Sequence, residues 1–181
     1  MMKKEEVYIT NNSKETQKVG EDFVQQAQRS DLSRLQGQAL QRKHAFIIAL
    51  HGDLGGGKTT FTQGIARGLG IKRRIISPTF VIVRQYNLRD YSSSGAQRSR
   101  EVIKADSSRQ ARTINFYHID LYRVESLKDI EMLGIEEIIN DPKNIVVIEW
   151  AEKIKDLLPK ERIDIHFEYI SDDKRKVTFY E

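Results

Sequence analysis

The sequence predicts a P-loop NTPase-type three-layer α/β fold built on a mostly parallel central sheet, and two features of the chain indicate the α/β sheet. The segment at 45–50 is continuously apolar, as expected for a strand that is covered on both faces, and the segment at 144–150 contains four consecutive apolar residues before Glu149. Segments with apolar residues at helical spacing alternate with such strands, which is the pattern of an α/β sheet. The 181 residues show no internal repeat and suffice for one core, so we expect a single domain over 1–181.

The first half of the chain predicts the order strand, helix, strand, helix. A short strand at 7–10 precedes an amphipathic helix for which Ser13 is the expected N-cap. The strand at 45–50 leads through a glycine cluster into a second helix, which begins near Lys58 and closes on Gly70. A strand, a glycine loop and a helix therefore follow one another directly.

The second half predicts further strands at 79–86, 113–120 and 144–150, with one helix at 126–139 between the last two. The C-terminal residues differ, because two strand-like segments flank the turn-like sequence SDDKR at 171–175. We expect this hairpin to extend the sheet in the antiparallel direction at one edge.

A flexible basic insertion is predicted at about 89–112. This segment holds six serines, six basic residues and three acidic residues, and it has almost no apolar side chain to bury. The whole chain carries a formal charge of +4, which permits contact with nucleic acid without requiring it.

Composition excludes several classes of chemistry. The chain has no cysteine, so disulfides, thiolate metal sites and cysteine nucleophiles are excluded, and its four scattered histidines make a catalytic zinc site a poor fit. No apolar run approaches the roughly 18 residues that a membrane span needs, and the start of the chain lacks the pattern of a signal peptide. We therefore expect a cytoplasmic protein.

The segment HGDLGGGKTTF contains the phosphate-loop pattern G-x-x-x-x-G-K-[ST] between a buried strand and a helix. Backbone N–H groups of such a loop and the positive end of the helix dipole can hold phosphate oxygens. Lys58 supplies a positive charge toward the β- and γ-phosphates of ATP, and the Thr59 hydroxyl suits a Mg²⁺ ligand. The expected nucleotide-binding residues are Gly52, Asp53, Leu54, Gly55, Gly56, Gly57, Lys58, Thr59 and Thr60.

Two strands end in carboxylates that could act near the metal, Asp120 and Glu149. Each could instead cap a helix or lie at the surface, because strand ends commonly carry such residues. Ser77 and Thr79 flank Pro78 just before a predicted strand, where their hydroxyls could sense a γ-phosphate; a simple turn at the strand entry is the alternative.

Four segments, HGDLGGGKTTF, SPTFVIVRQY, FYHIDLYRV and VVIEWAEKI, resemble those of the TsaE (YjeE) family in order and spacing. The resemblance covers about residues 8–181. It implies an ATPase that acts with the TsaB and TsaD proteins when a threonylcarbamoyl group is formed on the adenosine next to the anticodon of tRNAs reading ANN codons. The insertion at 89–112 is longer than this family leads us to expect; it could alter the docking of partners, add contacts with tRNA through its basic residues, or do neither.

The resemblance also implies roles for individual residues. Thr59 and Glu149 would hold Mg²⁺, Asp120 would take part in ATP hydrolysis, and Thr79 would belong to a switch-like segment. The nucleotide base would lie near Ser13 and near Arg175 of the final hairpin.

Two other functions remain open at this point. A P-loop small-molecule kinase shares the phosphate loop but also needs a lid with arginines and a pocket for the acceptor. A binding module that holds nucleotide as a structural ligand is the second alternative, and the set of Lys58, Thr59 and Glu149 argues against it.

Overall fold

The computed structural model describes residues 5–37, 43–78, 81–88 and 114–180, except for the side chains of 28–37 and of residue 127. The predicted insertion at 89–112 and the candidate Thr79 lie outside the described residues. The elements are β1 (Glu5–Thr10), α1 (Ser13–Gly37), β2 (Phe46–Gly52), α2 (Lys58–Gly68), β3 (Val83–Leu88), β4 (Ile114–Asp120), α3 (Leu127–Met132), α4 (Ile135–Asn140), β5 (Asn144–Glu149), the 3₁₀ turn η2 (Ala151–Ile154), β6 (Ile163–Tyr169) and β7 (Arg175–Tyr180).

The strands form one seven-stranded sheet in the order β1-β7-β6-β2-β5-β4-β3. Its centre is parallel, because β2 pairs in parallel with both β5 and β6, and β5 pairs in parallel with β4. Both edges are antiparallel: β7 joins β6 and β1 at one edge, and β3 joins β4 at the other. The predicted α/β class with a parallel core and an antiparallel C-terminal hairpin is confirmed.

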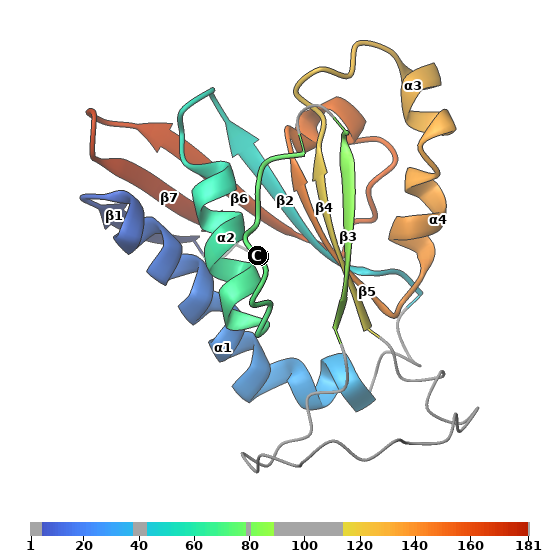
Figure 1. The fold of residues 1–181 in the computed structure, drawn as a ribbon, viewed down its shortest axis with the longest axis horizontal. Coiled ribbons are helices and arrows are strands. Elements are labelled where there is room, and N and C mark those ends of the chain that lie inside the picture. Colours follow the sequence, from blue (N-terminus) through green and yellow to red (C-terminus); the bar gives the residue numbers. More distant parts are fainter. Residues whose placement is uncertain (1–4, 38–42, 79–80, 89–113, 181) are drawn as a thin grey trace.

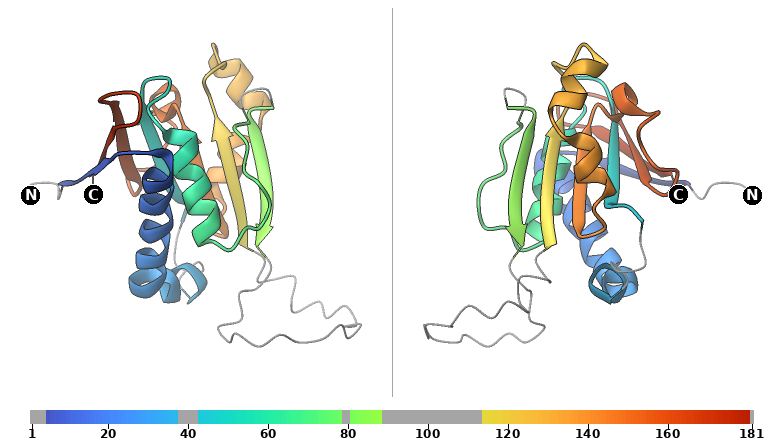
Figure 2. Two further views of the ribbon diagram at one scale, coloured as in Figure 1. Left: turned by 60° about the vertical axis from the view of Figure 1, so that its left-hand side comes forward. Right: turned by 90° about the vertical axis from the view of Figure 1, so that its right-hand side faces the viewer.

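Helices cover the parallel core from both faces, which gives three layers (Figure 1 and Figure 2). Strand β2 shows why its sequence is apolar throughout. Ile48 and Leu50 pack in the cluster that includes α1 and α2, whereas Ile47 and Ala49 pack in the cluster that includes α3, α4 and η2. Successive strand residues point to opposite faces, so a strand buried on both sides needs no polar positions.

Helices α1 and α2 approach each other closely through two glycines. A Cβ atom on Gly64 would lie 2.0 Å from the backbone oxygen of Gln17, and one on Gly20 would lie 2.4 Å from that of Phe61. Glycine inside a helix usually costs stability relative to alanine, so the close packing of the two helices explains both positions.

Three local predictions need correction. The expected helix at 126–139 is divided into α3 and α4, because Gly134 has a φ of 62° and interrupts the helical backbone. Strand β3 starts later than expected, after Ile82, which has the positive φ of 62° that strands exclude. The side chain that caps α1 is that of Asn12 rather than Ser13, because Asn12 Oδ1 accepts a hydrogen bond from the Glu15 N–H at 2.9 Å.

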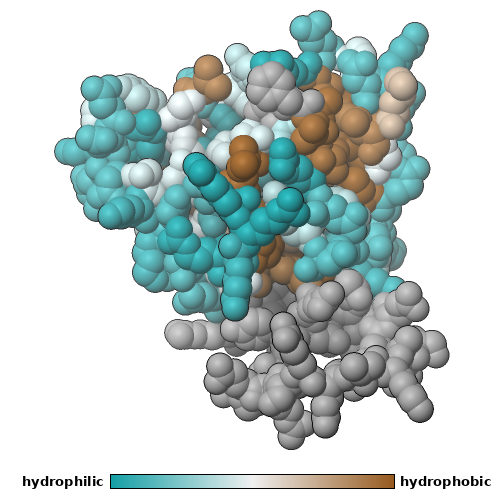
Figure 3. Space-filling model, in the orientation of Figure 1, coloured by the Kyte–Doolittle hydropathy of each residue, from teal (hydrophilic) through white to brown (hydrophobic). Residues whose placement is uncertain are grey.

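The surface over α1 and α2 is mainly polar, and apolar residues gather beside the upper half of β3 on the side toward α3 (Figure 3). Within the described segments, no helix combines the length and the apolar character that crossing a membrane requires.

We predict that Gly64→Ala lowers the free energy of unfolding by about 1–3 kcal/mol, because the added methyl group forces the backbones of α1 and α2 apart. Urea denaturation followed by circular dichroism measures this change. The exposed substitution Lys14→Ala in α1 is the control and should change the value by less than about 0.5 kcal/mol. Equal stability of Gly64→Ala and the wild type would contradict the close contact.

Candidate functional site

The candidate site lies where the parallel strands β2, β4 and β5 end. Asp120 is the register partner of Glu149, and Glu149 is the register partner of Leu50, so three strand ends lie side by side. Phe116 and Val147 point to the face covered by α1 and α2. Asp120 and Glu149 lie an even number of residues further along the same strands, so their side chains share that face. Both side chains are buried, which excludes the surface-carboxylate alternative.

The loop from Gly52 to Gly57 contains backbone conformations that only glycine adopts easily. Gly52 has a φ of 116°, and a Cβ atom there would lie 2.1 Å from the backbone oxygen of Phe167. Gly57 has a φ of 102° and is the N-cap of α2, where no described side chain caps the helix and no acidic residue occupies the first turn. The first N–H groups of α2 and its positive dipole end are therefore available to an anion.

Lys58 is buried inside this loop, with an exposed fraction of 4%. Its ammonium group donates to the backbone oxygen of Gly52 and to that of Asp53, the latter at 2.8 Å. It also lies 4.0 Å from the ring centroid of Trp150. Burial lowers the pKa of Lys58, although the carboxylate of Glu149 acts in the opposite direction. The cation is thus held by the loop's own carbonyl groups, at the place where phosphates are expected.

Thr59 and Glu149 form the contact that brings the loop and β5 together. The Thr59 hydroxyl donates to Glu149 Oε2 at 2.9 Å, and Glu149 Oε1 lies 2.7 Å from Nε2 of His118. Mg²⁺ prefers oxygen ligands and is often held by one or two carboxylates together with substrate phosphates. The hydroxyl and carboxylate oxygens fit such a role, and no group of three or more His, Cys, Asp or Glu in the described segments forms a self-sufficient metal site.

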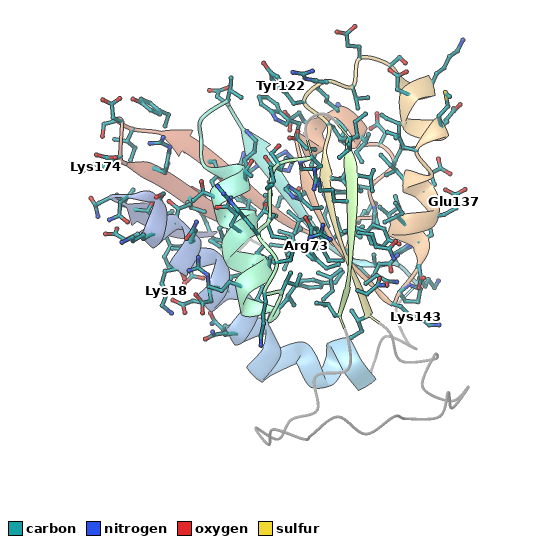
Figure 4. The ribbon with its side chains drawn as sticks, viewed as in Figure 1. Lys18, Arg73, Tyr122, Glu137, Lys143 and Lys174 are labelled. Carbon is teal, nitrogen blue, oxygen red and sulfur yellow. The ribbon has the colours of Figure 1, made fainter. Side chains whose placement is uncertain are left out.

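Asp120 occupies the end of β4, beside this pair. Its Oδ1 accepts the backbone N–H of Tyr122 at 3.0 Å, and its Oδ2 accepts the hydroxyl of Ser77 at 2.6 Å. Asp120 therefore stabilises the turn after β4 and connects it to the segment that contains Ser77. Tyr122, in this turn, lies at the upper end of the sheet (Figure 4).

The predicted base-binding residues lie at the other side of the loop. Arg175 Nε donates to the backbone oxygen of Gly55 at 2.8 Å, and the guanidinium carbon lies 4.7 Å from the ring centroid of Tyr169. The Arg175 side chain also lies 3.6 Å from the position that a Cβ atom would take on Gly57. Ser13 is exposed at the start of α1, about one turn before Thr16, whose methyl group is likewise 3.6 Å from that position.

Two residues of the site were not among those expected from the sequence. His118 contacts Glu149, and Trp150 lies over Lys58 with its own ring 5.2 Å from that of Tyr122. One signal was available for His118: it lies two residues before Asp120 in the same strand, so both side chains had to share a face. Trp150 has a φ of 61°, a backbone conformation that the sequence around it does not indicate.

A glycine loop between a parallel core strand and the open end of a helix, with a lysine inside it, defines the class of P-loop nucleotide-binding proteins. A comparison with models of known protein families then identifies the family within this class. The model of the family "Threonylcarbamoyl adenosine biosynthesis protein TsaE" matches residues 10–177. The chain therefore belongs to the TsaE family, and it has a role in the biosynthesis of threonylcarbamoyladenosine in tRNA.

Individual relatives agree with this assignment. The TsaE protein of Bacillus subtilis is 37% identical over 133 residues, which cover 74% of this chain and 68% of that protein. The TsaE protein of Rickettsia felis is 33% identical over 170 residues, which cover 92% of this chain and 75% of that protein. The crystal structure of YdiB from Bacillus subtilis superposes with a TM-score of 0.57 at 27% identity, covering 99% of this chain and 87% of the other.

His51, the residue immediately before the glycine loop, is held between two carboxylates. Its Nε2 lies 2.9 Å from Asp164 and its Nδ1 lies 3.3 Å from Glu152, while its ring stacks on His166 with 4.6 Å between centroids. Burial alone would lower the pKa of His51, but the bonds to Glu152 and Asp164 outweigh it and raise this pKa. Burial and the nearby His51 lower the pKa of His166. Of the two stacked rings, His51 is therefore the one that binds a proton more readily.

We predict that the stability contributed by His51 is present at pH 6 and is lost as pH rises toward 9. The folded pKa is raised above the unfolded value of about 6.5, so the favourable charged form disappears as pH passes through the folded pKa. Urea denaturation of the wild type and of His51→Gln at the two pH values measures the effect. The difference in unfolding free energy between the two proteins should be larger at pH 6, and a difference independent of pH would contradict it.

Proposed function

We propose that this chain is a Mg²⁺-dependent ATPase that acts with the TsaB and TsaD proteins to form the threonylcarbamoyl group on the adenosine next to the anticodon of tRNAs reading ANN codons. The observation that supports ATP hydrolysis most directly is the contact between Thr59 and Glu149 at the end of the glycine loop. Membership of the TsaE family supports the tRNA pathway. The proposed place of action is the cytoplasm.

The loop residues 52–60 have the task of binding the phosphates. Their backbone N–H groups and the start of α2 neutralise phosphate oxygens, and Lys58 exchanges its two carbonyl partners for the β- and γ-phosphates. Thr59 and Glu149 would hold Mg²⁺, which, when bound, withdraws charge from the phosphate oxygens as the terminal bond breaks. Ser13 and Arg175 lie on the side where we place the base.

Asp120 has a different task in this proposal. Its two oxygens are bonded to the turn after β4 and to Ser77, so it fixes the position of the segment that leads to Thr79. We propose that this segment responds to the γ-phosphate and that Asp120 transmits the response to the site of hydrolysis. Transfer of phosphate to a small molecule is the alternative reaction, and release of inorganic phosphate without any acceptor distinguishes the two.

The proposed dependence on partners rests on membership of the TsaE family and on the contacts of Lys58. The ammonium group of Lys58 is bonded to two carbonyl oxygens of the loop and lies beside the ring of Trp150, so these contacts must be exchanged when phosphates bind. A docked partner that favours this exchange would raise turnover. We therefore propose that the isolated protein turns over slowly and that TsaB and TsaD stimulate it.

We predict that Glu149→Gln and Asp120→Asn each lower the rate of ATP hydrolysis at least about tenfold, which corresponds to about 1.4 kcal/mol of barrier. Both replacements are nearly isosteric, so circular dichroism spectra should stay unchanged. Phosphate release at saturating ATP measures the rate, and Asp156→Asn, an exposed carboxylate that follows Glu149 in the chain, is the control. If one variant retains the wild-type rate, that carboxylate is structural.

We further predict that adding TsaB and TsaD raises phosphate release severalfold above the rate of the isolated chain. We expect the partners to favour the exchange of the Lys58 contacts for phosphate; for comparison, an arginine supplied by a partner raises turnover of some GTPases by about 10³ to 10⁵. Lys58→Ala, mixed with the same partners, gives the background rate. Fast turnover of the isolated chain that the partners leave unchanged would refute the coupling.

A further inference from the structure

His118 is the one histidine of the described residues that is wholly buried, with an exposed fraction of 0%. It lies in β4, on the face that α1 and α2 cover, two residues after Phe116 of the apolar cluster and two before Asp120. Its ring is therefore placed between the core and the ends of the strands. An apolar side chain would fill this position at no cost in polar desolvation.

Only one of the two ring nitrogens of His118 is hydrogen-bonded within the described residues. Nε2 lies 2.7 Å from Oε1 of Glu149, whereas Nδ1 has no hydrogen-bond partner among the described residues. A buried polar atom without a partner lowers stability. Because a carboxylate accepts and does not donate, Nε2 carries the proton in this bond. The ring thus makes a single directed hydrogen bond to Glu149 at a cost in stability, which points to a role at that carboxylate.

The two oxygens of Glu149 have different partners. Oε1 faces His118, and Oε2 faces the Thr59 hydroxyl at 2.9 Å. A carboxylate can rotate about its last bond, and the bond from His118 to Oε1 restricts this rotation so that Oε2 stays directed at the glycine loop. Residues that hydrogen-bond a metal ligand in this way commonly set its orientation, and their loss weakens metal binding by about 10- to 100-fold.

We propose that His118 is a positioning residue that orients the Glu149 carboxylate, so that Oε2 and the Thr59 hydroxyl together present two oxygens to the cation that accompanies the nucleotide. This inference rests on the proposed function of Glu149 as a Mg²⁺ ligand. His118 itself touches neither the nucleotide nor the cation. It acts through the carboxylate alone.

The test compares three replacements of His118. The variant His118→Gln can place an amide N–H near the position of Nε2, His118→Asn is too short to do so, and His118→Phe keeps the ring volume without a donor. The readout is the Mg²⁺ concentration that gives half-maximal binding of a fluorescent ATP analogue, measured beside the affinity for the analogue in EDTA.

We expect His118→Asn and His118→Phe to raise the required Mg²⁺ concentration at least about tenfold with little change of affinity in EDTA, and His118→Gln to restore most of the loss. Phe116→Leu, a buried change on the same strand and face, controls for packing and should leave the Mg²⁺ requirement unchanged. An unchanged requirement in His118→Asn and His118→Phe would overturn the inference, as would an equal loss in Phe116→Leu.

Glu149→Gln separates this inference from the proposed function. If Glu149→Gln leaves the Mg²⁺ requirement unchanged, Glu149 is no metal ligand and both proposals fail. If Glu149→Gln raises it and the His118 variants do not, only the role of His118 fails. In the double variant Glu149→Gln/His118→Asn the two effects should not add, because both act through the same carboxylate.

Discussion

The parallel pairing of β2, β5 and β4 is the constraint on which the site depends. It places Leu50, Glu149 and Asp120 in one row, so that the glycine loop and two carboxylates emerge at the same edge of the sheet. Side chains alternate along a strand, and a shift by one residue would turn the two carboxylates into the apolar layer of α3 and α4. The polar ends of the strands favour this register, because Glu149 and Asp120 find their partners Thr59 and Ser77 only on the side of the glycine loop.

The charges gathered at this edge are costly to bury, and the structure compensates each of them by specific bonds. Lys58 has two backbone carbonyl partners and the ring of Trp150, Glu149 has Thr59 and His118, and Asp120 has Ser77 and a backbone N–H. Removing one partner of a buried charge usually costs more than the intact pair contributes. These bonds therefore define one arrangement of the site more than they stabilise the fold.

The position of the loop depends on contacts with α1 and β7, which are far from it in the sequence. Helix α2 begins at the loop and packs on α1 through Gly20 and Gly64, so the helix start is fixed against the sheet. Arg175 of β7 bonds to Gly55 from the opposite side. Strand β7, which supplies Arg175, also pairs with β1, so the first and the last described strands lie beside each other at this edge of the sheet. The antiparallel hairpin therefore supports the site as well as the edge of the sheet.

The sequence by itself determined the α/β class, the glycine loop, the strands that carry Asp120 and Glu149, and the resemblance to the TsaE family, which the comparisons confirm. These features are encoded locally, by apolar periodicity and by residue spacing within short segments. It did not determine the division of 126–139 at Gly134, the pairing of β3 with β4, or the cap at Asn12. The contacts of His118 with Glu149 and of Arg175 with Gly55 join residues far apart in the chain. Only the tertiary structure decided them, because such contacts depend on strand order and register rather than on the pattern of any one segment.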